Sequence, residues 1–189
     1  MNNSYFTKIK NDFETYDKKR RVVIGSSNEA LGLSKRAIFA FHRDHYKEGF
    51  DNLKKAESIF KKLEKLSVSV PRLRHEGSWR AALEEYVEAK LFGTFLKSRK
   101  VEEIRNRQID TEIFLGGLCD FTGELVRRAV KEATAKNYKE VETIKKNIEQ
   151  IMQNLIKLNL TGYLRTKYDQ AKNNLRKIEE IMYELSLRK

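Results

Sequence analysis

Apolar residues recur every three or four positions near the C-terminus, which is the period of a helix with one buried face. Over the last stretch these positions are Leu164, Tyr168, Ala171, Leu175, Ile178, Met182 and Leu185. The preceding stretch repeats the pattern with Val141, Ile144, Ile148, Ile151, Leu155 and Leu158. Residues 159–162 form only a short connection between the two stretches. We therefore predict two consecutive helices that run antiparallel.

The N-terminal part of the chain carries a third stripe of this period and several helix-boundary signals. The stripe consists of Leu53, Ala56, Ile59 or Phe60, Leu63 and Leu66. Ser26 and Glu29 have the spacing of a capping box, which predicts that a helix starts near Ser27. Gly25 would then mark a kink or break in a long helical region. Gly49 is expected to end the helix that follows.

The rest of the chain also favours helices. Asp110 or Thr111 can cap a helix that runs to about Ala135. Pro71 is the only proline in 189 residues, and a charged fraction of 35% with abundant Lys, Glu and Leu is typical of helical proteins. We predict an all-α protein of about seven helices, built as a single domain over residues 1–189.

Two acidic residues lie on a face that is otherwise apolar. If residues 79–97 form a helix, Glu85 and Glu88 fall one turn apart within an arc that includes Phe92 and Phe95. Carboxylates in such a place are costly unless something pairs with them. Basic residues from a neighbouring helix, a shared proton or a metal ion would each reduce that cost.

The next helix carries a second acidic pair. Asp120 and Glu124 flank its apolar stripe, one turn beyond Gly116 and Gly117. Glycine inside a helix costs about 1 kcal/mol relative to alanine, so the glycine pair predicts close approach of another backbone. That backbone could be the helix of Glu85. Four carboxylates would then converge, and their repulsion favours a metal site over a network of ion pairs with arginines.

The net charge indicates the class of partner. Lys and Arg number 39 against 27 Asp and Glu, which gives a formal net charge of +12. Basic residues gain affinity for a polyanion by releasing counterions, so nucleic acid is the first candidate, an acidic membrane surface the second, and a solvated surface without a ligand the third. A carboxylate-bound Mg²⁺, with Mn²⁺ as an alternative, would polarise a phosphoryl oxygen and activate water. The combination predicts a phosphodiester substrate.

Four strings of the sequence resemble the translin family, and in particular its branch of translin-associated factor X (TRAX). They are SKRAIFAFHR at 34–43, LEEYVEA at 83–89, GLCDFTGELVR at 117–127 and KIEEIMYELSLR at 177–188. The likeness spans nearly the whole chain in order, which makes it more specific than any single motif. It implies a right-handed superhelix of seven helices that assembles into a hollow octamer and binds single-stranded nucleic acid.

The resemblance also implies roles for particular residues. The TRAX branch cleaves RNA with Mg²⁺, and its acids match Glu85, Glu88 and Asp120 here, with Glu124 as a fourth acid nearby. Basic residues that fall where translin-type subunits carry a nucleic-acid-binding segment are Arg72, Arg74, His75 and Arg80. We also expect phosphate contacts from Lys35, Arg36 and Arg43.

This chain lacks the long tails and insertions of eukaryotic TRAX proteins, so it looks like a compact prokaryotic form, of the archaeal kind. We therefore expect a homo-octamer that binds and cuts single-stranded RNA, with single-stranded DNA as an alternative ligand. A second hypothesis from another class is a translin-like nucleic-acid-binding protein without catalysis, in which the acids are only ion-paired.

Other features offer weaker alternatives. Arg36 and His42 match the Arg-x(4–6)-His spacing of HEPN ribonucleases, which are helical and use no metal, but so short a motif often matches by chance. Trp79 and Tyr86 are candidates for stacking on bases. Cys119 is the only cysteine, which excludes an intrachain disulfide and suits a reducing cytosol. Neither a signal peptide nor an apolar run of the roughly 20 residues that span a bilayer is recognisable, so we expect a cytoplasmic protein without a membrane partner.

Overall fold

The computed structural model describes residues 3–106 and 108–187, and these form helices joined by short connections. Their elements are α1 (Asn3–His42), α2 (Tyr46–Ser67), the 3-10 helix η1 (Pro71–His75), α3 (Gly77–Ser98), α4 (Thr111–Thr134), α5 (Tyr138–Leu155) and α6 (Gly162–Ser186). The all-α prediction is confirmed, since no strand occurs in these residues. The expected seven helices become six α-helices and one 3-10 helix over the described part of the chain.

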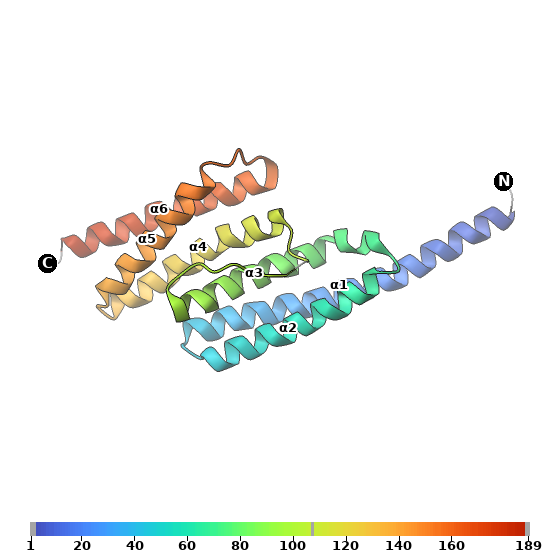
Figure 1. The fold of residues 1–189 in the computed structure, drawn as a ribbon, viewed down its shortest axis with the longest axis horizontal. Coiled ribbons are helices and arrows are strands. Elements are labelled where there is room, and N and C mark those ends of the chain that lie inside the picture. Colours follow the sequence, from blue (N-terminus) through green and yellow to red (C-terminus); the bar gives the residue numbers. More distant parts are fainter. Residues whose placement is uncertain (1–2, 107, 188–189) are drawn as a thin grey trace.

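Helix α3 is the centre of the fold. It packs against α1 on one side and α4 on the other, α2 covers α1, and α5 and α6 pack on α4 (Figure 1). Apolar side chains of α3 are buried on most of its circumference, including Trp79, Leu83, Val87, Phe92 and Phe95. Any charged side chain on α3 therefore lies close to another helix, which decides where the acidic residues end up.

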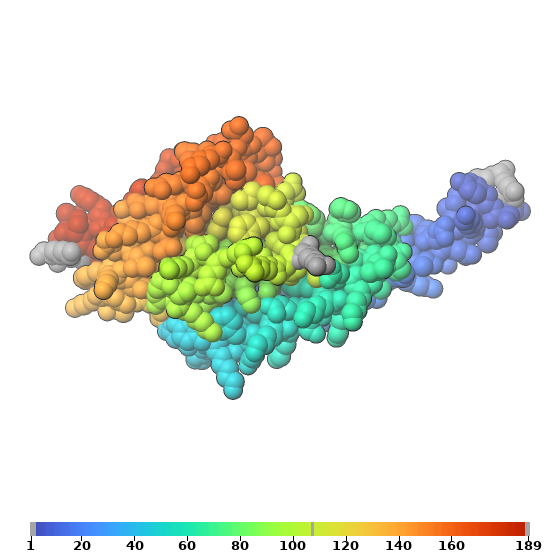
Figure 2. Space-filling view, in the orientation of Figure 1, coloured from blue at the N-terminus to red at the C-terminus, as the bar shows by residue number. Residues whose placement is uncertain are grey.

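The predicted break near Gly25 is wrong, because α1 is one continuous helix. A Cβ on Gly25 would meet nothing within 4 Å, so no packing constraint requires the glycine there. Ser26 and Glu29 lie inside the helix, where preceding carbonyls accept the hydrogen bonds of the backbone N–H groups and no cap is needed. The first turns of α1 stand clear of the body, which leaves Phe6 and Phe13 more than half exposed (Figure 2).

Gly49 does not end a helix either. It lies in the first turns of α2, where a Cβ would collide with the ring of Phe41. The chain reverses instead at Asp44, which adopts a positive φ of 62° between α1 and α2. Gly49 is thus a packing residue that lets α2 approach α1, and it explains why a glycine occurs early in a helix.

The remaining helix predictions are confirmed with one shift. Asp110 caps α4, since its side chain accepts a hydrogen bond from the Ile113 backbone at 2.9 Å. The chain turns after α5, and α6 runs back across it (Figure 1). Leu158 lies beyond the end of α5 and is exposed, so it does not belong to the buried stripe. Among the described residues, none of the helices is long and apolar enough to cross a membrane.

Candidate functional site

Helices α3 and α4 approach each other most closely at the glycine pair of α4. A Cβ on Gly117 would stand 2.7 Å from the Glu84 backbone oxygen and 2.7 Å from the Val87 Cβ, and one on Gly116 would collide with the Glu84 side chain. The predicted close approach of another backbone is confirmed, and the approaching helix is the one that carries Glu85. The acids on the next turn of each helix are therefore brought together.

Replacing Gly117 with alanine is expected to destabilise the protein by about 1–3 kcal/mol, because backbone atoms cannot yield to the added methyl group as a flexible side chain does. The matched control is Gly25→Ala, whose Cβ meets open space. That change should stabilise the helix by up to about 1 kcal/mol. Urea denaturation of both variants measures the difference. Equal stability of the two variants would contradict the close approach of α3 and α4.

Four carboxylates from α3 and α4 form what we call the acidic cluster. Its members are Glu85, Glu88, Asp120 and Glu124. Burial raises the pKa of Glu88 to about 9, and the charges of the three other carboxylates act in the same direction. Burial also raises the pKa of Glu85 and of Asp120, against the opposing positive charges of Lys35 and Lys167 respectively. The predicted convergence of the four acids is therefore present in the fold.

The members of the acidic cluster differ in their partners. Asp120 is in contact with Lys167, and Glu124 with His42 Nε2 and, at 3.7 Å, with Arg127. Glu85 lies 3.9 Å from the ammonium group of Lys35. Glu88 has no hydrogen-bond or ion-pair partner within the part of the chain that the structure describes. A network of arginines does not neutralise this cluster, and Glu88 is left without a counter-ion.

Lys167 is a member of the site that sequence reasoning missed. It extends from α6 and bonds Asp120 together with Glu84, at 2.8 Å from the latter, while Tyr163 donates a hydrogen bond of 2.5 Å to Glu84. Burial would lower the pKa of Lys167, but the hydrogen bonds to the two acids raise it above its ordinary value. Nothing in the sequence distinguishes this lysine from the other basic residues of α6.

The donor chemistry of the acidic cluster fits a hard divalent cation. Carboxylate oxygens are the ligands such ions prefer, and Glu88 is half-buried near like charges, without a cationic partner among the described residues. Within residues 3–106 and 108–187, no three side chains already stand in a ligand arrangement. Asp120 and Glu124 are engaged by Lys167 and His42. These two carboxylates would have to turn from their partners to join Glu85 and Glu88 around one ion.

The basic residues proposed for nucleic-acid binding fall into two groups. Lys35 and Arg36 lie exposed on the second half of α1, Arg43 is exposed just after its end, and Lys35 is the one that reaches the acidic cluster. The second group surrounds η1 and the start of α3, and its members are Arg72, Arg74, His75 and Arg80. Arg72 stacks over the ring of Tyr16 at 3.4 Å, and Arg80 pairs with Asp110 at 2.6 Å and with Glu112 at 2.9 Å.

Several weaker sequence alternatives lose their geometric basis. His42 is buried against Phe92 and in contact with Glu124, whereas Arg36 is exposed. Positions six residues apart on one helix point about 120° away from each other, so the two side chains do not form a HEPN-type pair. The expectation that Trp79 and Tyr86 stack on bases is wrong, because both are buried.

Cys119 is a packing residue. It is buried, and burial raises the pKa of its thiol to about 12. A thiol with so high a pKa stays protonated near neutral pH and is a weak nucleophile.

Comparison with known proteins agrees with this arrangement of helices. The curated relatives are translins, with 31% identity over 130 residues for the protein of Gallus gallus and 28% for that of Homo sapiens. Each match spans 61% of this chain, and 57% of the relative, so the match extends over little more than half of those proteins. Two solved structures share the fold: apo-NeC3PO, with a TM-score of 0.84 and 22% identity over 94% of this chain and 95% of that one, and a complex of AfC3PO with duplex RNA, with a TM-score of 0.89 and 21% identity over 98% of each.

The family assignment rests on the match to a family model and not on these pairs. The model of the translin family matches residues 18–189, which include α2 to α6 and most of α1. Both acidic helices and both groups of basic residues lie within this range. The chain therefore belongs to the translin family.

Proposed function

We propose that this protein is a Mg²⁺-dependent endoribonuclease of the TRAX-like branch, which binds and cleaves single-stranded RNA as a homo-oligomer. The observation that carries the proposal is Glu88, a half-buried carboxylate without an ion-pair partner among the described residues, whose pKa burial and the three other acids raise to about 9. A protein that only binds RNA has no need of such a costly group. Cation binding would offset the repulsion within the acidic cluster.

Glu85, Glu88, Asp120 and Glu124 would hold the ion. A bound Mg²⁺ would polarise the scissile phosphate and lower the pKa of an attacking water. Lys35, at 3.9 Å from Glu85, would bind a phosphate oxygen next to the cluster. Arg36, on the same helix, and Arg43, just after its end, are exposed and would bind neighbouring phosphates of the strand.

The solved structures that share this fold support the proposal of RNA binding in an assembly. One of them was solved as a complex with duplex RNA. The net charge of +12 gives this chain the electrostatic property that binding a polyanion requires. The octamer is proposed from the family resemblance, and the exposed apolar residues of the first turns of α1, such as Phe6 and Phe13, would be covered in it.

A specific observation favours the second candidate, a binding protein without catalysis. Asp120 and Glu124 already have cationic or histidine partners in Lys167 and His42, as residues with purely structural roles would. In that case the acids stabilise the contact between helices and hold no metal. Single-stranded RNA would still bind to the basic residues of α1 and η1.

Incubation of the full-length protein with a labelled single-stranded RNA separates the two candidates. We expect cleavage with Mg²⁺ or Mn²⁺ and none in EDTA, while RNA binding measured by fluorescence polarisation persists in both. Binding without cleavage under every condition would make the protein a binding module. Cleavage that continues in EDTA and disappears in His42→Ala would instead indicate a metal-free mechanism.

A further inference from the structure

Lys167 bonds one acid inside the acidic cluster and another acid outside it. Its ammonium group contacts Asp120, which is a member of the cluster, and lies 2.8 Å from Glu84, which is not. The other cations that reach the cluster in the described part of the chain, Lys35 and Arg127, each pair with a single acid. Lys167 can therefore lose its partner in the cluster and still be held at the site.

Glu84 is fixed on more than one side. Tyr163 donates a hydrogen bond of 2.5 Å to the same carboxyl oxygen that pairs with Lys167. The Glu84 side chain also fills the space that Gly116 leaves open, because a Cβ on Gly116 would collide with the Glu84 carboxyl group. The glycine, the tyrosine and the lysine together hold this carboxylate in one place. Glu84 is thus the permanent partner of Lys167.

Asp120 is the more replaceable partner of Lys167. Its side chain is 25% exposed, against 13% for that of Glu84. A divalent cation carries twice the charge of an ammonium group, so it competes well for an accessible carboxylate. With such a cation on Asp120, Lys167 would keep Glu84 and would have one N–H donor free beside the occupied site.

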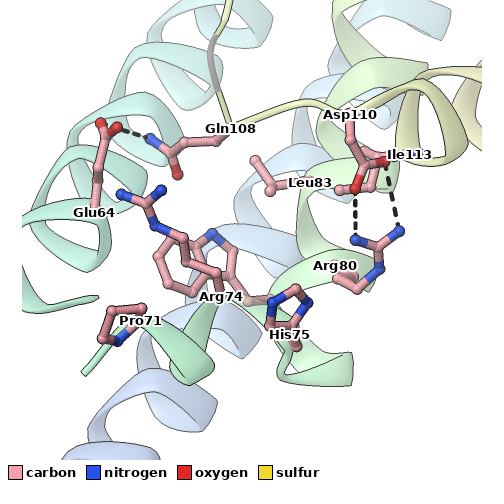
Figure 3. A pocket seen from close by; sticks show the side chains of 10 residues that line it. Glu64, Pro71, Arg74, His75, Arg80, Leu83, Gln108, Asp110 and Ile113 are labelled. Atoms are coloured by element: carbon pink, nitrogen blue, oxygen red, sulfur yellow. Dashed lines mark hydrogen bonds and ion pairs between the residues drawn. The ribbon is translucent and has the colours of Figure 1, made fainter. Parts of the chain in front are cut away.

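Arg80 provides a comparison within the same fold, since it is also held by two acids. It lies 2.6 Å from Asp110 and 2.9 Å from Glu112, and Figure 3 shows its guanidinium group directed at Asp110. Neither of these acids belongs to the acidic cluster. The pairing of Arg80 therefore joins α3 to the start of α4, whereas that of Lys167 reaches into the candidate catalytic site.

We propose that Lys167 is a catalytic residue of the proposed nuclease, and that it exchanges Asp120 for a non-bridging oxygen of the scissile phosphate when a divalent cation binds Asp120. Glu84 is the positioning residue, because it keeps the ammonium group beside the acidic cluster during this exchange. Lys167 stabilises negative charge on the phosphate and neither gives up nor takes a proton. This role rests on the proposed function, since it requires both the cation and a phosphodiester substrate.

Lys167→Met tests the contact with the phosphate through two measurements on the full-length protein. Calorimetry without RNA gives the Kd of Mg²⁺, and single-turnover cleavage of a labelled single-stranded RNA gives the rate at saturating Mg²⁺. We expect the Kd to fall about tenfold, because the lysine no longer competes for Asp120, and the rate to fall about a hundredfold, because the phosphate loses a cationic donor. A lysine that only balances the charge of the metal-free protein would lower the Kd in the same way but leave the rate unchanged.

Glu84→Gln tests the positioning role. Glutamine keeps the shape of the side chain and can still accept the hydrogen bond of Tyr163, but it no longer holds the charge of Lys167. The lysine then depends on Asp120, so the Kd of Mg²⁺ should rise, and the rate at saturating Mg²⁺ should fall about tenfold because the ammonium group is less well placed. Lys172→Met, an exposed lysine of α6, is the matched control and should change neither quantity.

Opposite changes in the Kd of Mg²⁺ with slower cleavage in both variants cannot arise from a general loss of folding, which circular dichroism checks. If Lys167→Met does not fold, the two measurements on Glu84→Gln decide alone. A wild-type cleavage rate in Lys167→Met would overturn the contact with the phosphate and leave the proposed function standing, and a wild-type rate in Glu84→Gln would overturn the positioning role. A wild-type protein that neither binds Mg²⁺ nor cleaves RNA would contradict the proposed function, and the exchange at Asp120 with it.

Discussion

Replacing Glu88 with glutamine is expected to lower Mg²⁺-dependent RNA cleavage by about a hundredfold to a thousandfold, with RNA affinity changed less than about twofold. Glutamine preserves the shape of the side chain but cannot carry the negative charge that a metal requires. Glu88 lies on α3 and pairs with no basic residue in the described part of the chain, so the strand should bind as before. Single-turnover cleavage and fluorescence polarisation on the same RNA measure the two effects.

The same variant also tests the raised pKa of Glu88, through the dependence of folding stability on pH. The pKa of Glu88 in the folded protein, about 9, lies above the ordinary value near 4.3. The unfolded chain therefore releases this proton between these two pH values while the folded protein retains it. Stability is highest below the lower value and falls with rising pH by up to about 1.4 kcal/mol per pH unit.

Glu88→Gln should lack this loss, so urea denaturation in EDTA at pH 5, 7 and 9 should give a flatter profile than the wild type. Glu102→Gln, in the exposed connection before α4, is the control and should match the wild type in both cleavage and pH profile. Full cleavage by Glu88→Gln would contradict the metal-binding role. A parallel pH profile would contradict the burial of the carboxylate.

The acidic helices could be predicted from sequence because their signals are local. Glu85 and Glu88 stand out on an apolar arc, and the cost of burying a carboxylate makes such a position informative. Gly116 and Gly117 stand out for the same kind of reason, since glycine weakens a helix unless close packing requires it. In the structure, burial raises the pKa of Glu85 and of Glu88, and Glu84 and Val87 pack against the two glycines.

Helix boundaries in the N-terminal half were predicted less well, because contacts between helices determine where these helices begin and end. The capping signal at Ser26 and Glu29 is real as a pattern, but the segment continues as a helix because its residues from Val23 onward pack against α2 and α3. Gly49 resembled a helix end, and its actual role is visible only when Phe41 from α1 occupies the space of its missing side chain. The helix propensity of a segment contains no information about a side chain from another helix that packs against it in the folded protein.

Lys167 could not be predicted because its partners are distant in the chain. Asp120 is 47 residues away, and the pairing arises only when α6 crosses α4 beside α3. The sequence contains 39 Lys and Arg residues, and Lys167 lies on a mostly polar face of α6. Its contacts with Asp120 and Glu84 make it the internal counter-ion of the site.

Replacing Lys167 with methionine is expected to destabilise the protein by about 3 kcal/mol in EDTA, because two partly buried carboxylates lose their cation. Methionine retains much of the apolar length, so the loss reports mainly on charge. Mg²⁺ should then stabilise the variant more than the wild type, since Asp120 is released to bind the ion. Urea denaturation with and without Mg²⁺ measures both effects.

Lys172→Met, an exposed lysine further along α6, is the matched control and should behave like the wild type with and without the ion. If Mg²⁺ stabilises neither the wild type nor Lys167→Met, the acids are structural ion-pair partners and the binding-protein candidate is favoured. If Lys167→Met is as stable as the wild type in EDTA, the lysine contributes no net stability to the site. A selective stabilisation of Lys167→Met by Mg²⁺ would mean that lysine and metal compete for the same carboxylate, with Lys167 balancing the charge of the metal-free protein.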